Sequence, residues 1–218
     1  MNLHIENINL TSNSGPNSFA NKLIKYITKS SVEVDFTKKP DAHLCFIESN
    51  KIEFKKPMFL RLDGIYFNVD FDYRSQNSNI KRTYELADGV IFQSEFNKQL
   101  TFKYFGNHNN YTIIQNGADY EMINQAPELK FDRYENLWCC ASSCGCQIIC
   151  SSAGGTKEIA GSNAIVIEEA PWDYTPVRLY SPPIMDFNKK INTGRDNELK
   201  MNKVSEKYKN FIFGEKNA

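Results

Sequence analysis

The sequence lacks a net charge, a long apolar run and a basic leader segment. Lys plus Arg and Asp plus Glu each number 26 in a chain of 218 residues, so no overall field favours nucleic acid or an anionic membrane as a partner. No stretch approaches the ~18 continuous apolar residues that span a bilayer. The first ten residues, MNLHIENINL, lack the basic and apolar regions of a signal peptide. We therefore expect a cytoplasmic protein with no integral membrane segment and no nucleic-acid partner.

Motifs for hydrolytic and metal chemistry are missing as well. No G-x-S-x-G sequence is present, which removes the usual basis for a hydrolase triad. His4, His43 and His108 are too far apart for an H-E-x-x-H zinc motif. The one Asp-x-Asp spacing begins at Asp70, and no strand-like run positions it. We expect no metal and no resident cofactor.

Cysteine is sparse except in one short segment. Six cysteines are present, and five of them lie between Cys139 and Cys150. In a reducing compartment they would be thiols rather than disulfides. The spacings Cys140-x3-Cys144 and Cys146-x3-Cys150 differ from the C-x2-C pairs of structural zinc sites. They favour cysteine as a small buried hydrophobe in two strand-like runs, and a zinc site is the alternative.

In the first half of the chain, strand-like and helix-like segments alternate. Short apolar runs indicate strands at residues 3–10, 32–36, 43–49, 57–64 and 88–94, and residues 111–119 form a last strand with a Gly turn. Apolar residues at three- and four-residue spacing indicate helices at residues 19–27, 76–87 and 96–104. This alternation predicts parallel βαβ units with right-handed crossovers. We expect an α/β, doubly wound domain over residues 1–130, followed by a polar linker.

The second half, residues 131–218, is smaller than a usual domain and less regular. Strands are indicated by NLWCCASS, by CQIICSS and by residues 164–169, and a Gly turn opens a short helix within residues 153–160. The last helix has an apolar stripe made of Met201, Val204, Tyr208 and Phe211. We expect this stripe to pack on a domain rather than on a membrane surface.

Three loops follow predicted strands, at the edge where open α/β sheets bind ligands. They are residues 13–17, 115–119 and 152–158. Glycine allows close backbone approach, and a helix N-terminus offers free N–H groups to a phosphate or a sugar hydroxyl. Each loop taken alone could equally be an ordinary capped turn. Asp63 also follows a strand-like run, and it could act as a base toward an acceptor hydroxyl or cap the next turn.

Five segments occur in a fixed order along the chain: GPNSFANKLIKYI, RLDGIYF, IKRTYELADGVIFQSEF, IIQNGAD and CSSAGGTKEIAG. In this order they resemble the landmarks of the retaining GT-B glycosyltransferases of family four. The resemblance covers nearly the whole chain, and the ordered set is more specific than any one segment. It implies two Rossmann-like domains across a cleft. It also implies transfer of a sugar from a nucleotide-sugar donor to a hydroxyl of a glycan or another acceptor.

The resemblance implies binding roles for residues of the three loops, and no cofactor, since the nucleotide-sugar is a substrate. In the first loop, Gly15 and Asn17 would lie beside the transferred sugar. In the second, Asn116 and Gly117 would lie near the hinge between the domains. The donor side of the cleft would be lined by Gly154, Gly155 and Thr156.

One part of the family pattern is missing from this chain. Family members carry a basic Arg/Lys segment that clamps the donor diphosphate and, further on, two glutamates eight positions apart. Here Ser142-Ser143 runs directly into Cys144, and neither feature has a counterpart. The C-terminal domain, residues 131–218, would therefore be truncated. Because lost charged contacts weaken transition-state binding, we expect weak or absent sugar transfer.

Three hypotheses about function follow. The first is a glycosyltransferase of the GT-B type. The second is a non-catalytic remnant that binds a glycan, a nucleotide or a partner protein, and the third is a small zinc-stapled α/β protein. Strand edges exposed by the missing segment would favour self-association.

Overall fold

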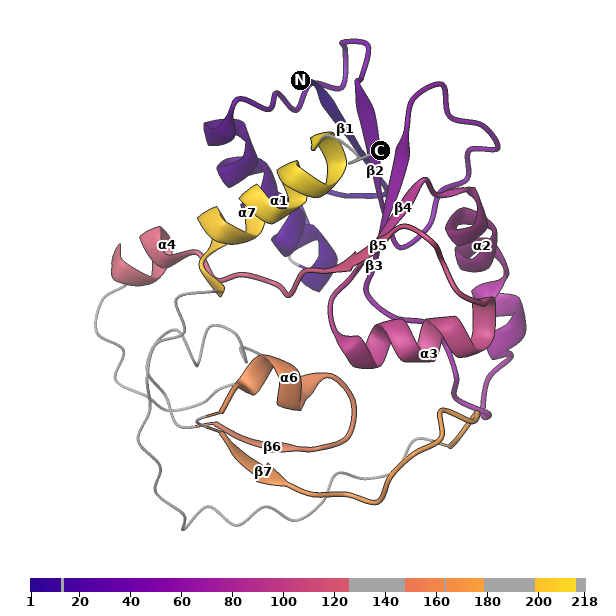
Figure 1. The fold of residues 1–218 in the computed structure, drawn as a ribbon. Coiled ribbons are helices and arrows are strands. Elements are labelled where there is room, and N and C mark those ends of the chain that lie inside the picture. The colour runs from indigo at the N-terminus through magenta and orange to yellow at the C-terminus, as the bar shows by residue number, and fades with distance from the viewer. Residues whose placement is uncertain (13, 126–147, 163, 179–198, 215–218) are drawn as a thin grey trace.

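A computed structural model of the chain describes residues 1–12, 14–125, 148–162, 164–178 and 199–214. The main sheet consists of β1 (Leu3–Glu6), β2 (Ala42–Phe46), β3 (Met58–Leu62), β4 (Gly89–Phe92) and β5 (Tyr111–Ile113) (Figure 1). The long helices that accompany this sheet are α1 (Gly15–Ile27), α2 (Tyr73–Leu86), α3 (Glu95–Phe105) and α7 (Met201–Phe213). Two short helical turns, η1 (Thr28–Ser30) and α4 (Tyr120–Gln125), follow α1 and β5.

The strands lie in the order β1-β2-β3-β4-β5, and each neighbouring pair is parallel. Every residue of β2, β3 and β4 is buried, as in parallel sheets with both faces covered. On the far side of β1, a parallel bridge joins Asn2 to Glu33, and the Leu3 N–H donates to the Glu33 carbonyl at 2.8 Å. β1 therefore has a parallel neighbour on each side, β2 on one and the bridge at Glu33 on the other. Because Glu33 lies between β1 and β2 in the sequence, the strand order reverses at β1.

One face of the sheet is covered by α1 and α7, which lie against each other (Figure 1). Each helix buries an apolar stripe at three- and four-residue spacing. The stripe residues are Phe19, Leu23 and Ile27 from α1 and Met201, Val204 and Tyr208 from α7. They share one core with Leu3 and Ile5, the alternate side chains of β1. The last helix of the chain is therefore part of the core of the main sheet.

The other face is covered by α2 and α3. Ile80 and Tyr84 from α2 and Leu100 from α3 form a second core with the sheet. From the sheet, Leu60 and Val90 point into this core and are fully buried. With helices on both faces, the molecule has three layers.

Helix starts are fixed by local chemistry. Pro16 occupies the first turn of α1, where its missing N–H costs nothing. The Asp72 carboxylate accepts from the Ser75 N–H at 3.1 Å at the start of α2. The Ser94 hydroxyl accepts from the Asn97 N–H at 3.1 Å at the start of α3. Such caps stabilise a helix by about 1 kcal/mol each, so these residues set where α2 and α3 begin.

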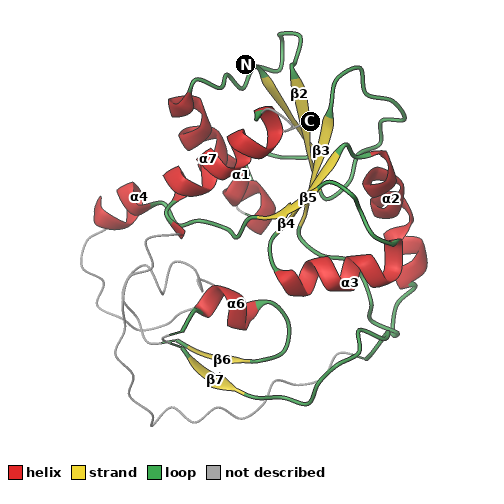
Figure 2. Cartoon of the chain, in the orientation of Figure 1, coloured by secondary structure: helices red, strands yellow, loops and turns green. Residues whose placement is uncertain are grey.

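A second, separate pair of parallel strands lies beside the carboxyl edge of the main sheet (Figure 2). It consists of β6 (Ile149–Ser151) and β7 (Ile165–Ile167), connected through α6 (Thr156–Ala160). We call residues 148–162 and 164–167 the small unit. Gly154, with φ of 72°, makes the turn into α6, a conformation that glycine adopts without strain.

We call β1–β5 with α1–α4 and α7 the sheet domain. An extended strap, residues 172–178, runs from the small unit along residues 66–70 of the sheet domain. The Val177 N–H donates to the Phe67 carbonyl, and the Val69 N–H donates to the Val177 carbonyl, both at 3.1 Å. The strap therefore attaches to the loop that follows β3 by backbone hydrogen bonds.

The predicted α/β class, with a parallel sheet and helices on both faces, is confirmed, and most predicted elements are present with shorter bounds. The strand predicted at 32–36 is reduced to the bridge at Glu33, and η1 and α4 were not predicted. The linker after residue 125 and the run LWCCASS lie outside the described residues, so the boundary at residue 130 stays a prediction. In the described part of the chain, no helix combines the length and apolarity needed to cross a membrane.

Candidate functional site

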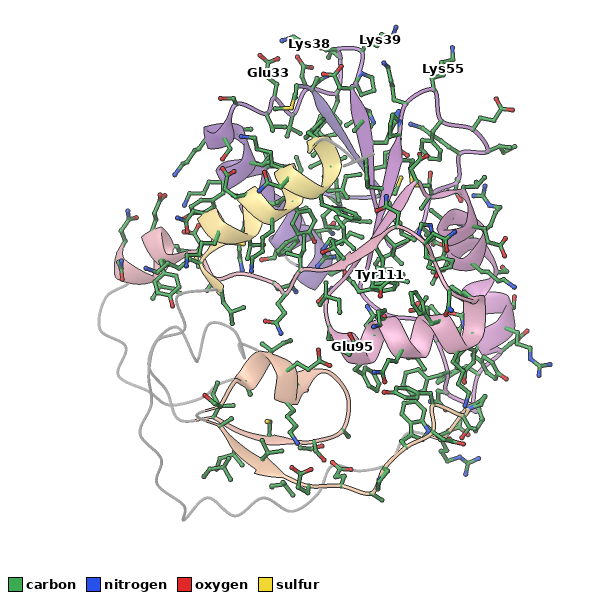
Figure 3. The ribbon with its side chains drawn as sticks, in the orientation of Figure 1. Glu33, Lys38, Lys39, Lys55, Glu95 and Tyr111 are labelled. Atoms are coloured by element: carbon green, nitrogen blue, oxygen red, sulfur yellow. The ribbon has the colours of Figure 1, made fainter. Side chains whose placement is uncertain are left out.

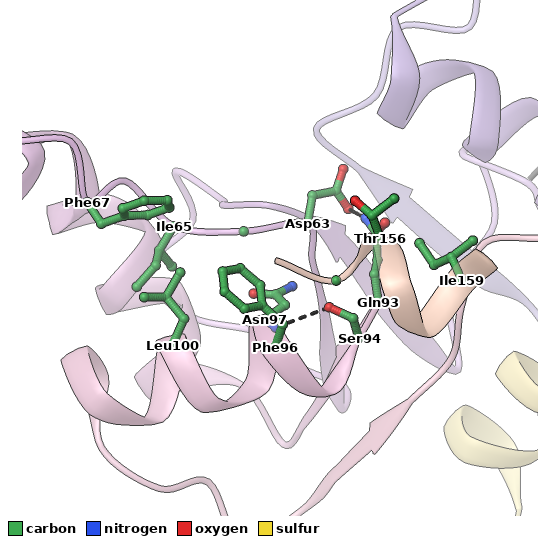
Figure 4. A pocket seen from close by; sticks show the side chains of 12 residues that line it. Asp63, Ile65, Phe67, Gln93, Ser94, Phe96, Asn97, Leu100, Thr156 and Ile159 are labelled. Atoms are coloured by element: carbon green, nitrogen blue, oxygen red, sulfur yellow. Dashed lines mark hydrogen bonds between the residues drawn. The ribbon is translucent and has the colours of Figure 1, made fainter. Parts of the chain in front are cut away.

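A cavity of about 320 Å³ opens at the carboxyl ends of β3 and β4, and we call it the strand-end pocket. Its walls come from the loops after these strands, from the first turns of α3 and from the start of α6 (Figure 4). Asp63, Gln93 and Thr156 lie together at its polar end, and Phe67 and Leu100 lie at its apolar end. This is the edge at which open α/β sheets bind ligands.

The opposite edge of the sheet carries charged loops instead. Glu33, Lys38, Lys39 and Lys55 gather at the amino ends of the strands (Figure 3). Lys38 pairs there with Glu33 at 2.7 Å, and both side chains are more than half exposed. Glu95, at the start of α3, lies at the other edge beside the small unit. Exposed ion pairs of this kind contribute about 0–1 kcal/mol, so the pair of Lys38 and Glu33 adds little to stability.

The polar end of the pocket is organised by a hydrogen-bond network around Arg61, the fourth residue of β3. Arg61 donates to an Asp63 carboxylate oxygen, and Gln93 donates to the same oxygen. Arg61 also donates to the Asn116 amide oxygen at 2.9 Å. Asn116 in turn donates to the Gln93 amide oxygen at 3.0 Å. The four side chains close a ring that joins the ends of β3, β4 and β5.

Arg61 is fully buried, which is unusual for a charged residue. Its guanidinium lies 4.3 Å from the ring centre of Phe19 and 4.8 Å from that of Phe46. Both rings present an electron-rich face to the cation, which offsets part of its lost hydration. Arg61 therefore links the apolar core under α1 to the polar end of the pocket.

Asp63 keeps 23% of its side chain exposed beside the buried Arg61. Burial raises the pKa of the Asp63 carboxyl, and the Arg61 charge and the Gln93 hydrogen bond reduce that shift without reversing it. A carboxylate with a raised pKa is a stronger base and hydrogen-bond acceptor. Asp63 is thus suited to accept a hydrogen bond from a ligand hydroxyl.

The small unit supplies the wall formed by Gly155 and Thr156. A Cβ atom on Gly155 would lie 2.6 Å from the Ser94 hydroxyl oxygen and 2.9 Å from its Cβ. Only glycine therefore permits α6 to approach the start of α3 this closely. Of the three residues predicted on the donor side of a cleft, Gly155 and Thr156 line the same cavity as Asp63, whereas Gly154 does not.

Glu158 of α6 binds the N-terminus of α3. One of its carboxylate oxygens accepts from the Glu95 N–H at 2.5 Å, and the other accepts from the Phe96 N–H at 2.8 Å. The next N–H, from Asn97, is already bonded to the Ser94 hydroxyl. The positive end of this helix, where an anionic ligand could bind, is thus occupied by the chain's own carboxylate.

Aromatic rings surround the apolar end of the pocket. The ring centres of Phe67 and Trp172 lie 5.1 Å apart, and those of Phe96 and Tyr174 lie 5.6 Å apart. Phe67 and Phe96 line the pocket itself, whereas the other two rings belong to the strap. Ring separations of this size are favourable, so the strap packs on the outer side of the pocket wall.

Gly15 and Asn17, the site residues predicted in the first loop, do not line this pocket. Asn17 accepts from the Asn9 N–H at 2.9 Å and donates to the Ser14 hydroxyl at 2.9 Å. Nothing lies within 4 Å of a Cβ placed on Gly15. Both residues sit at the carboxyl end of β1, and the bonds of Asn17 hold its own loop together.

The second predicted loop is divided between two roles. Asn116 belongs to the ring around Arg61, although it does not line the pocket. Gly117 instead faces α7, where a Cβ would lie 2.7 Å from the Met201 sulfur and 2.9 Å from a Val204 methyl. The adjacent Ala118 N–H donates to the Leu199 carbonyl at 2.7 Å. Gly117 therefore permits the close approach of α7.

Cys150 is the one residue of the cysteine cluster that lies within the described ranges, and it is buried in β6 as a free thiol. Burial raises the pKa of this thiol, which suits a packing role. The other four cysteines of the cluster fall outside those ranges. Across the residues described, no three His, Cys, Asp or Glu side chains are placed to hold a metal ion.

Comparisons with known proteins do not assign the chain to a family. No protein-family model matches the chain, and no curated protein matches it either. The GT-B assignment and the truncated second domain therefore rest on the order of the sequence segments and are carried forward as proposals.

Sequence reasoning assigned no such role to three residues that shape the site, Arg61, Gln93 and Glu158, although Glu158 lies within the predicted loop 152–158. A signal for Arg61 exists, because a lone charge inside the apolar run MFLRL is almost always paired when buried. Gln93 lies near the end of the run predicted as a strand at residues 88–94 and directly follows β4, so the strand-end rule could have found it. Glu158 gives no such signal, since its partner N–H groups lie more than sixty residues earlier.

Proposed function

We propose that the chain is a glycosyltransferase-like protein that binds the sugar of a nucleotide-sugar, or a related glycan, in the strand-end pocket. The supporting observation is that Asp63 lines one cavity with Gly155 and Thr156, which come more than ninety residues later in the sequence. On the GT-B interpretation these residues come from the two domains that flank a substrate cleft.

The chemistry of the pocket suits a neutral, hydroxyl-rich ring. Asp63, Gln93 and Thr156 offer acceptors and donors for hydroxyl groups at one end. Phe67 and Phe96 offer apolar ring faces at the other. At about 320 Å³, the volume is at the lower end of the range for ligand pockets, which fits a single sugar ring better than a whole nucleotide-sugar.

A specific observation favours the non-catalytic alternative over an efficient transferase. No Lys or Arg is among the described residues that line the pocket. The first N–H groups of α3, at this edge of the sheet, are bound to Glu158. A donor diphosphate would therefore find little charge stabilisation. We propose that sugar binding is retained and that transfer is weak.

Calorimetric titration of the full chain tests this proposal. The ligands are UDP-, GDP- and ADP-sugars, the free sugars and the free nucleotides. We expect binding to at least one nucleotide-sugar or free sugar. We also expect Asp63→Asn to weaken it about 10- to 150-fold, because hydrogen bonds to a charged group contribute about 1.5–3 kcal/mol.

The matched control is Asp35→Asn, the same chemical change in an exposed loop at the amino edge, where Asp35 bonds to Thr37. It should leave affinity unchanged. Tighter binding of nucleotide-sugars than of free sugars favours the transferase, and binding of free sugars alone favours the remnant. A folded chain that binds none of these ligands refutes both.

A further inference from the structure

The contact between α6 and α3 differs from every other contact around the pocket. The walls formed by β3, β4 and α3 are continuous with the buried core of the main sheet. The wall formed by Gly155, Thr156 and Ile159 belongs to the small unit, whose strands contain one buried residue each, Cys150 and Ile165. One wall of the pocket is therefore attached much less extensively than the others.

Among the described residues, the hydrogen bonds between α6 and the sheet domain are made by Glu158. Both carboxylate oxygens of Glu158 accept backbone N–H groups at the start of α3, and its own carbonyl accepts from the Gln115 side chain at 3.2 Å. Glu158 is exposed to solvent. A carboxylate at a helix N-terminus contributes about 0.3–1 kcal/mol when exposed and is weakened by salt. The contact is specific in geometry yet weak enough to open.

We infer that Glu158 is a latch that holds α6 as a movable wall of the strand-end pocket. When the carboxylate is bound to the α3 N-terminus, Gly155 fits against Ser94 and the pocket is closed on that side. When it leaves, the two N–H groups are solvated and α6 separates from α3. The consequence for ligand entry rests on the proposed function, but the latch itself can be tested without a ligand.

Hydrogen exchange of the full chain, followed by mass spectrometry, compares the wild type with Glu158→Ala and Glu158→Gln. In Glu158→Ala we expect the amides of residues 95–96 to lose protection. We also expect exchange across the small unit to become about two- to five-fold faster, which corresponds to 0.3–1 kcal/mol. Amides of β3 and β4 should be unchanged. Glu158→Gln should give a smaller effect, because it keeps one oxygen acceptor but loses the charge.

The control variant is Glu168→Gln, which removes a glutamate charge from the same region. Glu168 pairs with Lys157 at 2.9 Å, and both side chains are at least half exposed. This variant should leave exchange unchanged at residues 95–96 and in the small unit. A second measurement at about 1 M salt, where the screening length is about 3 Å, should accelerate the small unit in the wild type but not in Glu158→Ala.

Three results would overturn the inference. Unchanged protection of residues 95–96 in Glu158→Ala would mean that the contact does not form in solution. Loss of protection there without faster exchange in the small unit would mean that other contacts hold α6. An equal rise in β3 and β4 would mean that Glu158 stabilises the whole fold rather than a separable wall. None of these results depends on whether a sugar binds. The proposed function is tested separately, by the calorimetric titration.

Discussion

The sheet domain, made of β1–β5 with α1–α4 and α7, and the small unit use the same parallel strand pairing but are stabilised differently. In the sheet domain, β2, β3 and β4 are buried along their whole length. In the small unit, β6 and β7 bury one residue each. Backbone pairing is similar in both, so the difference lies in the apolar surface removed from water, which contributes about 25 cal/mol per Å².

This difference has a consequence for the pocket that lies between the two regions. The sheet domain supplies Asp63 and Gln93 on a rigid support, since both are fixed through the buried Arg61. The small unit supplies the facing wall through contacts at the protein surface. Regions with few buried contacts open locally at low free energy. The pocket therefore has one fixed side, where hydrogen-bonding geometry is set, and one side that can move.

The largest expected effect is on the free energy of unfolding, when a buried side chain is shortened in one region or the other. Leu60→Ala in β3 removes a fully buried side chain and should lower the free energy of unfolding by about 2–5 kcal/mol. Ile165→Ala in β7 should shift the main transition by less than about 0.5 kcal/mol, because the sheet domain does not depend on the small unit. Urea denaturation followed by far-UV circular dichroism measures both. Equal shifts would show that the two regions unfold as one.

The next effect tests whether α7 belongs to the sheet domain. Gly117→Ala places a Cβ within 3.0 Å of Met201, Val204 and the Leu199 carbonyl, and overpacking of this kind costs about 1–3 kcal/mol. Gly15→Ala is the matched control, because nothing lies within 4 Å of its Cβ, and alanine should be neutral or stabilise α1 by up to about 1 kcal/mol. Thermal unfolding of both variants checks the difference. A neutral Gly117→Ala would place α7 elsewhere in solution.

The fold of the sheet domain could largely be predicted, because the sequence patterns that indicate its helices and strands lie within each element. Apolar periodicity located α1, α2, α3 and α7, and short apolar runs located the five strands. The run at 32–36 failed as a strand because only Glu33 reaches β1. α4 escaped prediction because its six residues, YEMINQ, are too few for a helical period to be recognised.

The site was less predictable, because its key contacts join distant residues. Asp63, Gly155 and Thr156 could be proposed from their positions after strands or in a Gly turn. Nothing local indicates that Gly117 faces α7 or that Glu158 reaches α3, since both depend on how separate elements pack. Sequence patterns therefore identified residues at the carboxyl edge but could not assign their partners.

A smaller effect tests the fit between the two regions directly. Gly155→Ala should push α6 away from α3, because its Cβ would overlap the Ser94 side chain. We expect faster hydrogen exchange in the small unit, with β3 and β4 unchanged. Adding Ser94→Gly should restore protection, since it removes both overlapping atoms, and glycine at an N-cap costs only a few tenths of a kcal/mol. If the double variant exchanges as fast as Gly155→Ala, the overlap is not the cause.

The smallest effect concerns two aspartates whose pKa values shift in opposite directions. Burial raises the pKa of Asp63 at the pocket, and Arg61 offsets this only in part. Burial would also raise the pKa of Asp119, but hydrogen bonds from Lys25 and Tyr26 outweigh it and hold the pKa below the ordinary value of 3.8. Asp119 lies within the sheet domain, directly before α4, where these bonds tie the start of α4 to α1.

Linkage gives these shifts opposite effects on stability. The unfolding free energy of the wild type relative to Asp63→Asn should fall as the pH rises above the ordinary aspartate value, because ionising the buried Asp63 is unfavourable. Relative to Asp119→Asn, it should fall as the pH drops below that value, because protonation removes the acceptor for Lys25 and Tyr26. In each case the total change in unfolding free energy is about 1.4 kcal/mol per unit of pKa shift. Urea denaturation between about pH 3 and pH 6 measures both. Slopes of the same sign would mean that Asp63 is held by Arg61 as firmly as Asp119 is held by its partners, and the pocket carboxylate would then be a structural ion pair rather than an acceptor for a ligand.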